Sequence, residues 1–142
     1  MFRLAACALL VAGIFASRPT RNQIVYMVES GSLKQIAIAG ADGSGERRIS
    51  HPDRWSLYPD IDAPGAQVTY VTGPDANHLG VVLHDLDTGK VEPVSAAGGM
   101  NLHPKFSGDG STLAWSAPVG PGGRHQIAVL DLTRWRKDRA TR

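Results

Sequence analysis

Cysteine is almost absent from this 142-residue sequence, and no apolar run is long enough to cross a membrane. The single cysteine, Cys7, lies in an apolar run of thirteen residues, 4–16, that follows the basic residue Arg3. A spanning helix needs roughly 20 residues, whereas a basic start, a short apolar run and small residues are typical of a secretory signal. We therefore expect residues 1–17 to be a signal peptide, the protein to be periplasmic or secreted, and the mature chain to have no transmembrane span.

Loss of that segment would remove the only thiol, so the sequence predicts no disulfide and no cysteine metal site in the mature protein. Leu4-Ala5-Ala6-Cys7 matches a lipoprotein cleavage box letter by letter. A lipoprotein box follows an apolar run, however, and this one precedes most of it. The sequence favours cleavage near Ala16, with lipidation of Cys7 as the alternative.

Excess charge and catalytic motifs are also lacking. A formal net charge of +2 is too small to indicate a nucleic-acid partner. No G-x-S-x-G motif is present, so nothing indicates a serine hydrolase. The five histidines, none at the short spacing of a zinc pair, are His51, His78, His84, His103 and His125. We predict no catalytic residue, no metal site and no cofactor, and therefore not an enzyme.

Two glycine-containing segments resemble ligand loops only in part. The residues from Asp85 to Gly89 begin like a calcium loop, but the glycine comes one position early and Glu92 lies too close to be the distal ligand. A hairpin turn with Gly89 at positive φ accounts for the same residues. Residues 40–45 are rich in glycine but precede a strand, whereas a phosphate-binding loop precedes a helix. Both segments are therefore interpreted as turns.

No helical period is convincing after Ser17, and the sixteen glycines and nine prolines favour turns and strands. The dominant pattern is an internal repeat, because residues 58–71 align with residues 103–116 at a constant offset of 45. The matched pairs are Pro59/Pro104, Ile61/Phe106, Gly65/Gly110, Val68/Leu113 and Tyr70/Trp115. A third, partial copy begins at Gln23, at an offset of 44. Such a period predicts a repeat architecture.

Each repeat consists of short strands that are apolar on both faces, as in the blades of a β-propeller. The predicted strands group as three, four and three, because the first unit lacks its inner strand and the last lacks its outer strand. The fold class is therefore all-β: a partial propeller of about two and a half four-stranded antiparallel blades over residues 23–132. Closed propellers use roughly 4–8 blades. This strand count fits three alternatives: a truncated propeller, self-association that completes the ring, or an open stack covered by a partner.

The motifs Pro104–Gly110 (P-K-F-S-G-D-G) and Asp85–Gly89 (D-L-D-T-G) resemble the TolB-type propeller repeat, which also occurs in prolyl-oligopeptidase-like peptidases. The second copy departs from the pattern, with Asp-Ala-Pro-Gly at 62–65. The resemblance implies a non-catalytic interaction module in cell-envelope integrity or transport. TolB propellers contact a peptidoglycan-associated lipoprotein, which makes an envelope lipoprotein the expected partner. The alternatives are the propeller remnant of a secreted hydrolase that lacks its catalytic domain, and a truncated gene fragment.

Tyr58 and His103 precede the two predicted inner strands, which line the central channel of a propeller. They are the candidate partner-binding residues at the channel mouth, with turn packing as the alternative role. Residues 133–142 form a basic tail, expected to be a solvated terminus. Attraction to an anionic lipid or protein surface is the other interpretation of that tail.

Overall fold

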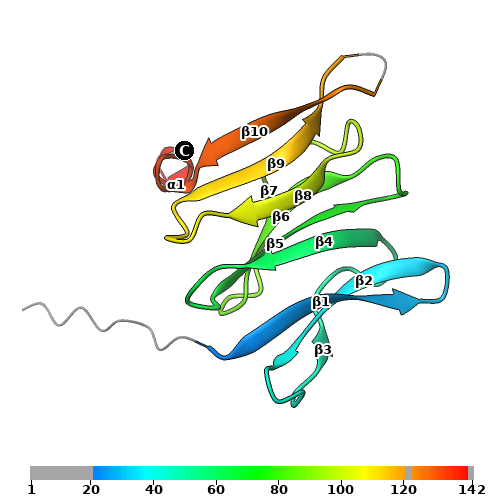
Figure 1. Cartoon of the computed structure of the whole chain (residues 1–142), viewed down its shortest axis with the longest axis vertical. Helices are drawn as coiled ribbons and strands as arrows, with labels where there is room; N and C mark the ends of the chain where they lie inside the picture. Colours follow the sequence, from blue (N-terminus) through cyan, green and yellow to red (C-terminus); the bar gives the residue numbers. More distant parts are fainter. Residues whose placement is uncertain (1–20, 121–122, 141–142) are drawn as a thin grey trace, which may run out of the picture.

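The computed structural model describes residues 21–120 and 123–140. The predicted signal peptide and Cys7 lie outside the described residues. Ten strands and one helix fill the described ranges (Figure 1): β1 (Gln23–Ser30), β2 (Leu33–Gly40), β3 (Arg47–Arg48), β4 (Trp55–Ile61), β5 (Gln67–Gly73), β6 (Gly80–Asp85), β7 (Val91–Pro93), β8 (Leu102–Phe106), β9 (Thr112–Pro118), β10 (His125–Asp131) and α1 (Leu132–Ala140).

The strands form three antiparallel sheets that stack on one another along the long axis of the molecule (Figure 1). We call them blade 1 (β1-β2-β3), blade 2 (β4-β5-β6-β7) and blade 3 (β8-β9-β10), each in the order in which the strands pair. The predicted grouping of three, four and three strands is confirmed for residues 21–120 and 123–140, where blade 1 has no inner strand and blade 3 has no outer strand. The fold is a partial all-β propeller.

Glycine turns join the strands at the same place in each repeat. Gly65 and Gly110, which follow the inner strands of blades 2 and 3, both adopt φ of 69°. Residues that carry a side chain rarely adopt this backbone conformation, so glycine is favoured at both positions. At Gly65 a Cβ would also lie 2.9 Å from the Cβ of Arg21, so the close approach of the chain leading into blade 1 adds a second constraint.

The blades are held together by two apolar clusters between facing sheets. Between blades 1 and 2, the buried residues are Ile36, Ile38, Val68, Tyr70 and Val82. Between blades 2 and 3, they are Val71, Leu79, Val81, Leu83, Leu113 and Leu132. Blade 2 contributes to both clusters, so each of its faces is buried. This explains why its strands read as continuous apolar runs rather than alternating ones.

The last element differs from the sequence prediction, which expected a frayed, solvated terminus and no helix. Leu132–Ala140 forms helix α1 instead. Asp131 caps it, because the backbone N–H of Arg134 donates to Asp131 Oδ1 at 2.9 Å. Leu132 is buried between blades 2 and 3, and Trp135 packs against the same cluster. Tertiary packing of these two residues, which the composition of a basic segment does not reveal, stabilises the helix.

Basic side chains of α1 also contact blade 2. The guanidinium of Arg139 lies 3.5 Å from the carboxylate of Glu92 on β7 and 4.8 Å from the centre of the Trp135 ring. Arg136 donates a hydrogen bond to Gln67 Oε1 at the start of β5. The helix therefore bridges blades 3 and 2.

His84 on β6 is buried, and its Nδ1 has no hydrogen-bond partner. Burial, and then the nearby charge of Arg47, lower the pKa of His84 from its usual 6.5. The repeat-equivalent residues in blades 1 and 3 are Ala39 and Leu130, which carry no charge. The folded protein therefore favours the neutral form of this histidine.

We predict that the free energy of unfolding falls as the pH drops from 7 to 5, and that His84→Leu reduces this dependence. Below a pH of about 6.5 the unfolded chain binds a proton at His84 that the folded chain resists, so protonation favours unfolding. Urea unfolding at both pH values measures the difference. His125→Leu, at an exposed histidine, is the control and should keep the wild-type dependence. An unchanged dependence in His84→Leu would contradict this role.

Candidate functional site

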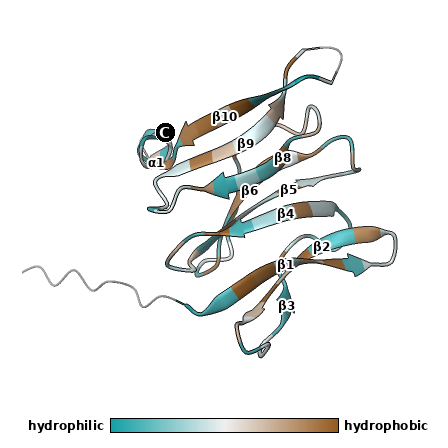
Figure 2. Ribbon diagram, in the orientation of Figure 1, coloured by the Kyte–Doolittle hydropathy of each residue, from teal (hydrophilic) through white to brown (hydrophobic). Residues whose placement is uncertain are grey.

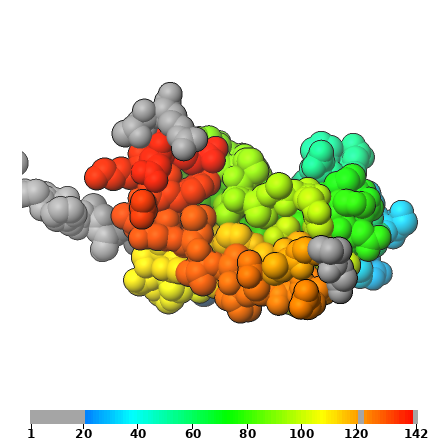
Figure 3. Space-filling model, turned by 90° about the horizontal axis from the view of Figure 1, so that it is seen from above, coloured from blue at the N-terminus to red at the C-terminus, as the bar shows by residue number. Residues whose placement is uncertain are grey.

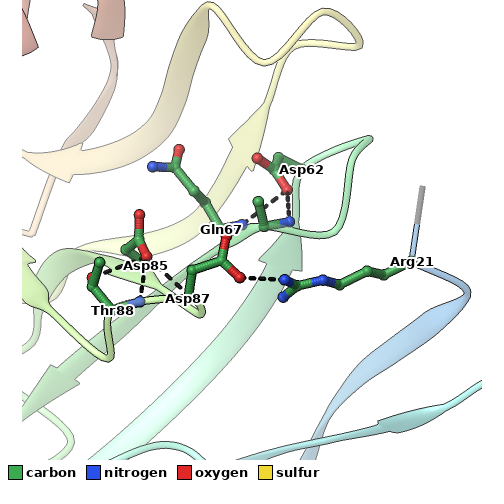
Figure 4. Close-up of polar contacts among 7 residues, drawn as sticks. Arg21, Asp62, Gln67, Asp85, Asp87 and Thr88 are labelled. Carbon is green, nitrogen blue, oxygen red and sulfur yellow. Dashed lines mark hydrogen bonds and ion pairs between the residues drawn. The ribbon is translucent and has the colours of Figure 1, made fainter. Parts of the chain in front are cut away.

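The acidic turns between strands are held by their own hydrogen bonds, as the sequence interpretation expected. Asp85 Oδ1 accepts from the N–H groups of Asp87 and Thr88 and from the Thr88 hydroxyl, at 2.8–3.0 Å (Figure 4). Gly89 has φ of 72°, which confirms the hairpin turn. In Figure 4, Arg21 pairs with Asp87, so this turn also fastens the beginning of blade 1 to blade 2.

The turn after each inner strand also uses a side-chain acceptor. Asp62 Oδ1 accepts from the N–H groups of Ala66 and Gln67 at 2.7 and 2.9 Å (Figure 4). In blade 3 the corresponding turn uses Ser107 and Asp109, which match the repeat pattern more closely. Hydrogen bonds from Ser107 and Ser111 lower the pKa of Asp109 to about 2. Residues 62–65, which differ from the repeat pattern, therefore use a different side-chain acceptor but form the same turn.

Tyr58 and His103 lie together, at the same place in two successive inner strands. Their ring centres are 4.0 Å apart, with the ring planes tilted by 43°. Each residue lies at a β-bulge, where the pairing of β4 with β5 and of β8 with β9 shifts register. Both residues were predicted only from their positions just before the inner strands of the repeat. Because the two inner strands are neighbours in space, the structure brings them into contact.

Both residues have an unusual backbone conformation. Tyr58 has φ of 54° and His103 has φ of 52°, and among the described residues they are the non-glycine residues with positive φ. Each precedes a proline, which normally restricts the preceding residue to extended conformations. A left-handed conformation costs a bulky residue of order 1–3 kcal/mol. The repeat preserves this strain in two blades, and it presents two aromatic rings side by side at the inner edge.

Asp60 fixes the spacing of the two inner strands. Its carboxylate accepts from Lys105 Nζ at 2.9 Å and from the backbone N–H of Phe106 at 2.9 Å. Both partners belong to β8, whereas Asp60 belongs to β4. The contact between Asp60 and Lys105 was not predicted from the sequence, because equivalent positions of the repeat were compared without asking which of them meet across blades. Their opposite charges at equivalent positions are the signal that could have found them.

The remaining histidines are dispersed. Within residues 21–120 and 123–140, no three His, Cys, Asp or Glu side chains gather as a metal site. His78 contacts Asp75 within its own loop, and His125 Nδ1 lies 2.9 Å from Ser116 Oγ on blade 3. No helix in the described part of the chain is both long and apolar enough to span a membrane. The inner edge with Tyr58, His103 and Asp60 is therefore the candidate site.

The chain is similar in sequence to known proteins. No family model matches the chain. The chain is 26% identical over 124 residues to the Tol-Pal system protein TolB of Gluconobacter oxydans, which is 84% of this chain and 27% of that protein. It is 32% identical over 80 residues to TolB of Alcanivorax borkumensis, which is 56% of this chain and 18% of that protein. The chain thus spans about a quarter or less of the length of these relatives.

Solved structures support the same fold. The structure of TolB from Acinetobacter baumannii matches with a TM-score of 0.64 and 21% identity, over 80% of this chain and 29% of that one. A prolyl endopeptidase matches with a TM-score of 0.56 and 16% identity, over 80% and 20%. The protein is a partial β-propeller. More specifically, its sequence and fold resemble TolB-like propellers, so the predicted TolB-type repeat is confirmed.

We predict that Asp60→Ala lowers the free energy of unfolding by about 1–2 kcal/mol, because the Phe106 N–H loses its acceptor and Lys105 loses its ion pair. Asp60→Asn should lose less, since an amide oxygen still accepts one hydrogen bond. Lys105→Ala, which removes only an ion pair whose lysine is largely exposed, should cost about 0–1 kcal/mol. Urea unfolding compares the three variants. Wild-type stability of Asp60→Ala would show that this carboxylate does not link the blades.

Proposed function

We propose that this protein is an exported, non-catalytic interaction module that binds a protein partner at the inner edge of blades 2 and 3. The observation that carries the proposal is the contact between the tilted rings of Tyr58 and His103, which are held in strained backbone conformations in both repeats. Such strain concentrates at functional sites, where the surrounding structure maintains it. A rigid aromatic pair also supplies a large contact area with little loss of side-chain entropy on binding.

The surroundings of this pair suit recognition of a polypeptide. Asp60 and Lys105 add a carboxylate and an ammonium group on the same two inner strands, and the Lys105 side chain is largely exposed. A partner segment could therefore stack on the rings and hydrogen bond to the charged groups. The TolB-like relatives, whose name places them in the Tol-Pal system, make an envelope lipoprotein the first candidate partner. Export to the periplasm is proposed from the sequence of residues 1–17 and from the same relatives.

A second candidate function is the propeller of a secreted hydrolase related to prolyl oligopeptidases. The specific observation in its favour is the fold similarity to a prolyl endopeptidase. That similarity has only 16% identity and covers a fifth of the endopeptidase. A non-catalytic role is preferred, because the relatives found by sequence are TolB proteins.

We predict that the purified protein binds a purified peptidoglycan-associated lipoprotein encoded by the same genome, and that Tyr58→Ala with His103→Ala weakens the affinity at least tenfold. Loss of two central aromatic contacts commonly costs that much. Isothermal titration calorimetry measures the affinity, and circular dichroism checks the fold of each variant. His78→Ala, at an exposed histidine in the β5–β6 loop, is the matched control and should bind normally. Failure of the wild type to bind, or full affinity of the double variant, would contradict the proposal.

A further inference from the structure

The two ends of the blade stack expose apolar residues where a further blade would pack. Figure 2 shows hydrophobic residues along β10 at one end of the stack and along β1 at the other. Figure 3 looks onto the blade 3 end, where atoms of β10 (orange) lie at the surface. Ile127 and Val129 on β10 are 72% and 66% exposed. Side chains of this kind are normally covered.

The repeat shows what covers these positions elsewhere in the molecule. Val81 and Leu83 of blade 2 are the equivalents of Ile127 and Val129, and they are 0% and 4% exposed. They are buried against blade 3, where Leu113 and Trp115 belong to the same cluster. Ile36 and Ile38 of blade 1 occupy the same two positions and are buried against Val68 and Tyr70 of blade 2. In both interfaces, two aliphatic residues of one strand (β2 in blade 1, β6 in blade 2) contact an aliphatic and an aromatic residue of the next blade.

Blade 1 offers that same aliphatic and aromatic pair on its own open face. Ile24 and Tyr26 on β1 are the repeat equivalents of Val68 and Tyr70 in blade 2 and of Leu113 and Trp115 in blade 3. Ile24 is 47% exposed, and Tyr26 is half-buried. The open face of blade 3 has a hollow of about 330 Å³ lined by His103, Lys105, Ala114, Trp115, Ser116 and Ile127. Tyr26, whose hydroxyl donates to Glu46 Oε2, is the aromatic residue that blade 1 would bring to this hollow in an equivalent contact.

We propose that blade 1 of a second copy of this chain covers the open face of blade 3, and that the reciprocal contact closes a two-fold ring. A contact between two different faces closes into a ring when the rotation it imposes divides a full turn. The described residues of each copy form three sheets, so those of two copies bring together six. Six sheets lie within the roughly 4–8 blades of closed propellers, whereas the nine sheets of three copies exceed that number. Two copies therefore suffice for a closed ring built from the described sheets.

The first test is the native mass of the purified full chain at micromolar concentration, measured by light scattering after size exclusion. We expect twice the 15.1 kDa calculated for one chain, reduced by the signal segment if it is removed. Ile127→Lys and Ile24→Asp should each produce a monomer, because each places a charge in both interfaces of the ring. Val91→Lys, at a 44% exposed position on β7 of the middle blade, is the control and should remain a dimer.

An equimolar mixture of Ile127→Lys and Ile24→Asp should restore the dimer. In the mixed pair one interface is wild type, and the other joins a lysine to an aspartate. A wild-type monomer would overturn the proposal and leave the face to a blade of another chain. Dimerisation of Ile24→Asp alone would indicate that blade 3 packs on blade 3. A mixture that stays monomeric would also overturn head-to-tail pairing.

Discussion

The packing of one sheet face on the next is the interaction on which this structure depends. The sheets are apolar on both faces, so none of them is stable in water with both faces exposed. Blade 2 satisfies this constraint within the chain, because its two faces are buried against blades 1 and 3. Blades 1 and 3 each bury one face, the one that packs on blade 2. The order of the blades and the position of α1 follow from this requirement, whereas β10 leaves it unmet on the open face of blade 3.

The candidate site is a consequence of the same stacking. Tyr58 and His103 are far apart in sequence, but successive inner strands lie side by side, so equivalent positions in neighbouring blades meet. Asp60 then joins the strands through one ion pair and one backbone hydrogen bond. A repeat protein can thus assemble a binding surface from a residue position that occurs once per repeat.

Much of the fold could be predicted from the sequence, because the repeat carries it. The constant offset between Pro59 and Pro104, or between Tyr70 and Trp115, indicated equivalent strands, and the strand grouping followed. The site was predicted in part, since the positions of Tyr58 and His103 are set by the repeat. Their backbone strain, and the pairing of Asp60 with Lys105, depend on bulges and on contacts between blades. Helix α1 was missed because burial of Leu132 and capping by Asp131 decide its formation, against a basic and weakly periodic composition.

The most direct test of this account is the cost of truncating a side chain between two blades. Leu83 lies in the cluster between blades 2 and 3 and is almost fully buried. If face-to-face packing holds the chain together, Leu83→Ala should lower the free energy of unfolding by about 2–5 kcal/mol in urea titrations. A loss below about 0.5 kcal/mol would show that the blades do not depend on one another, and it would contradict the account.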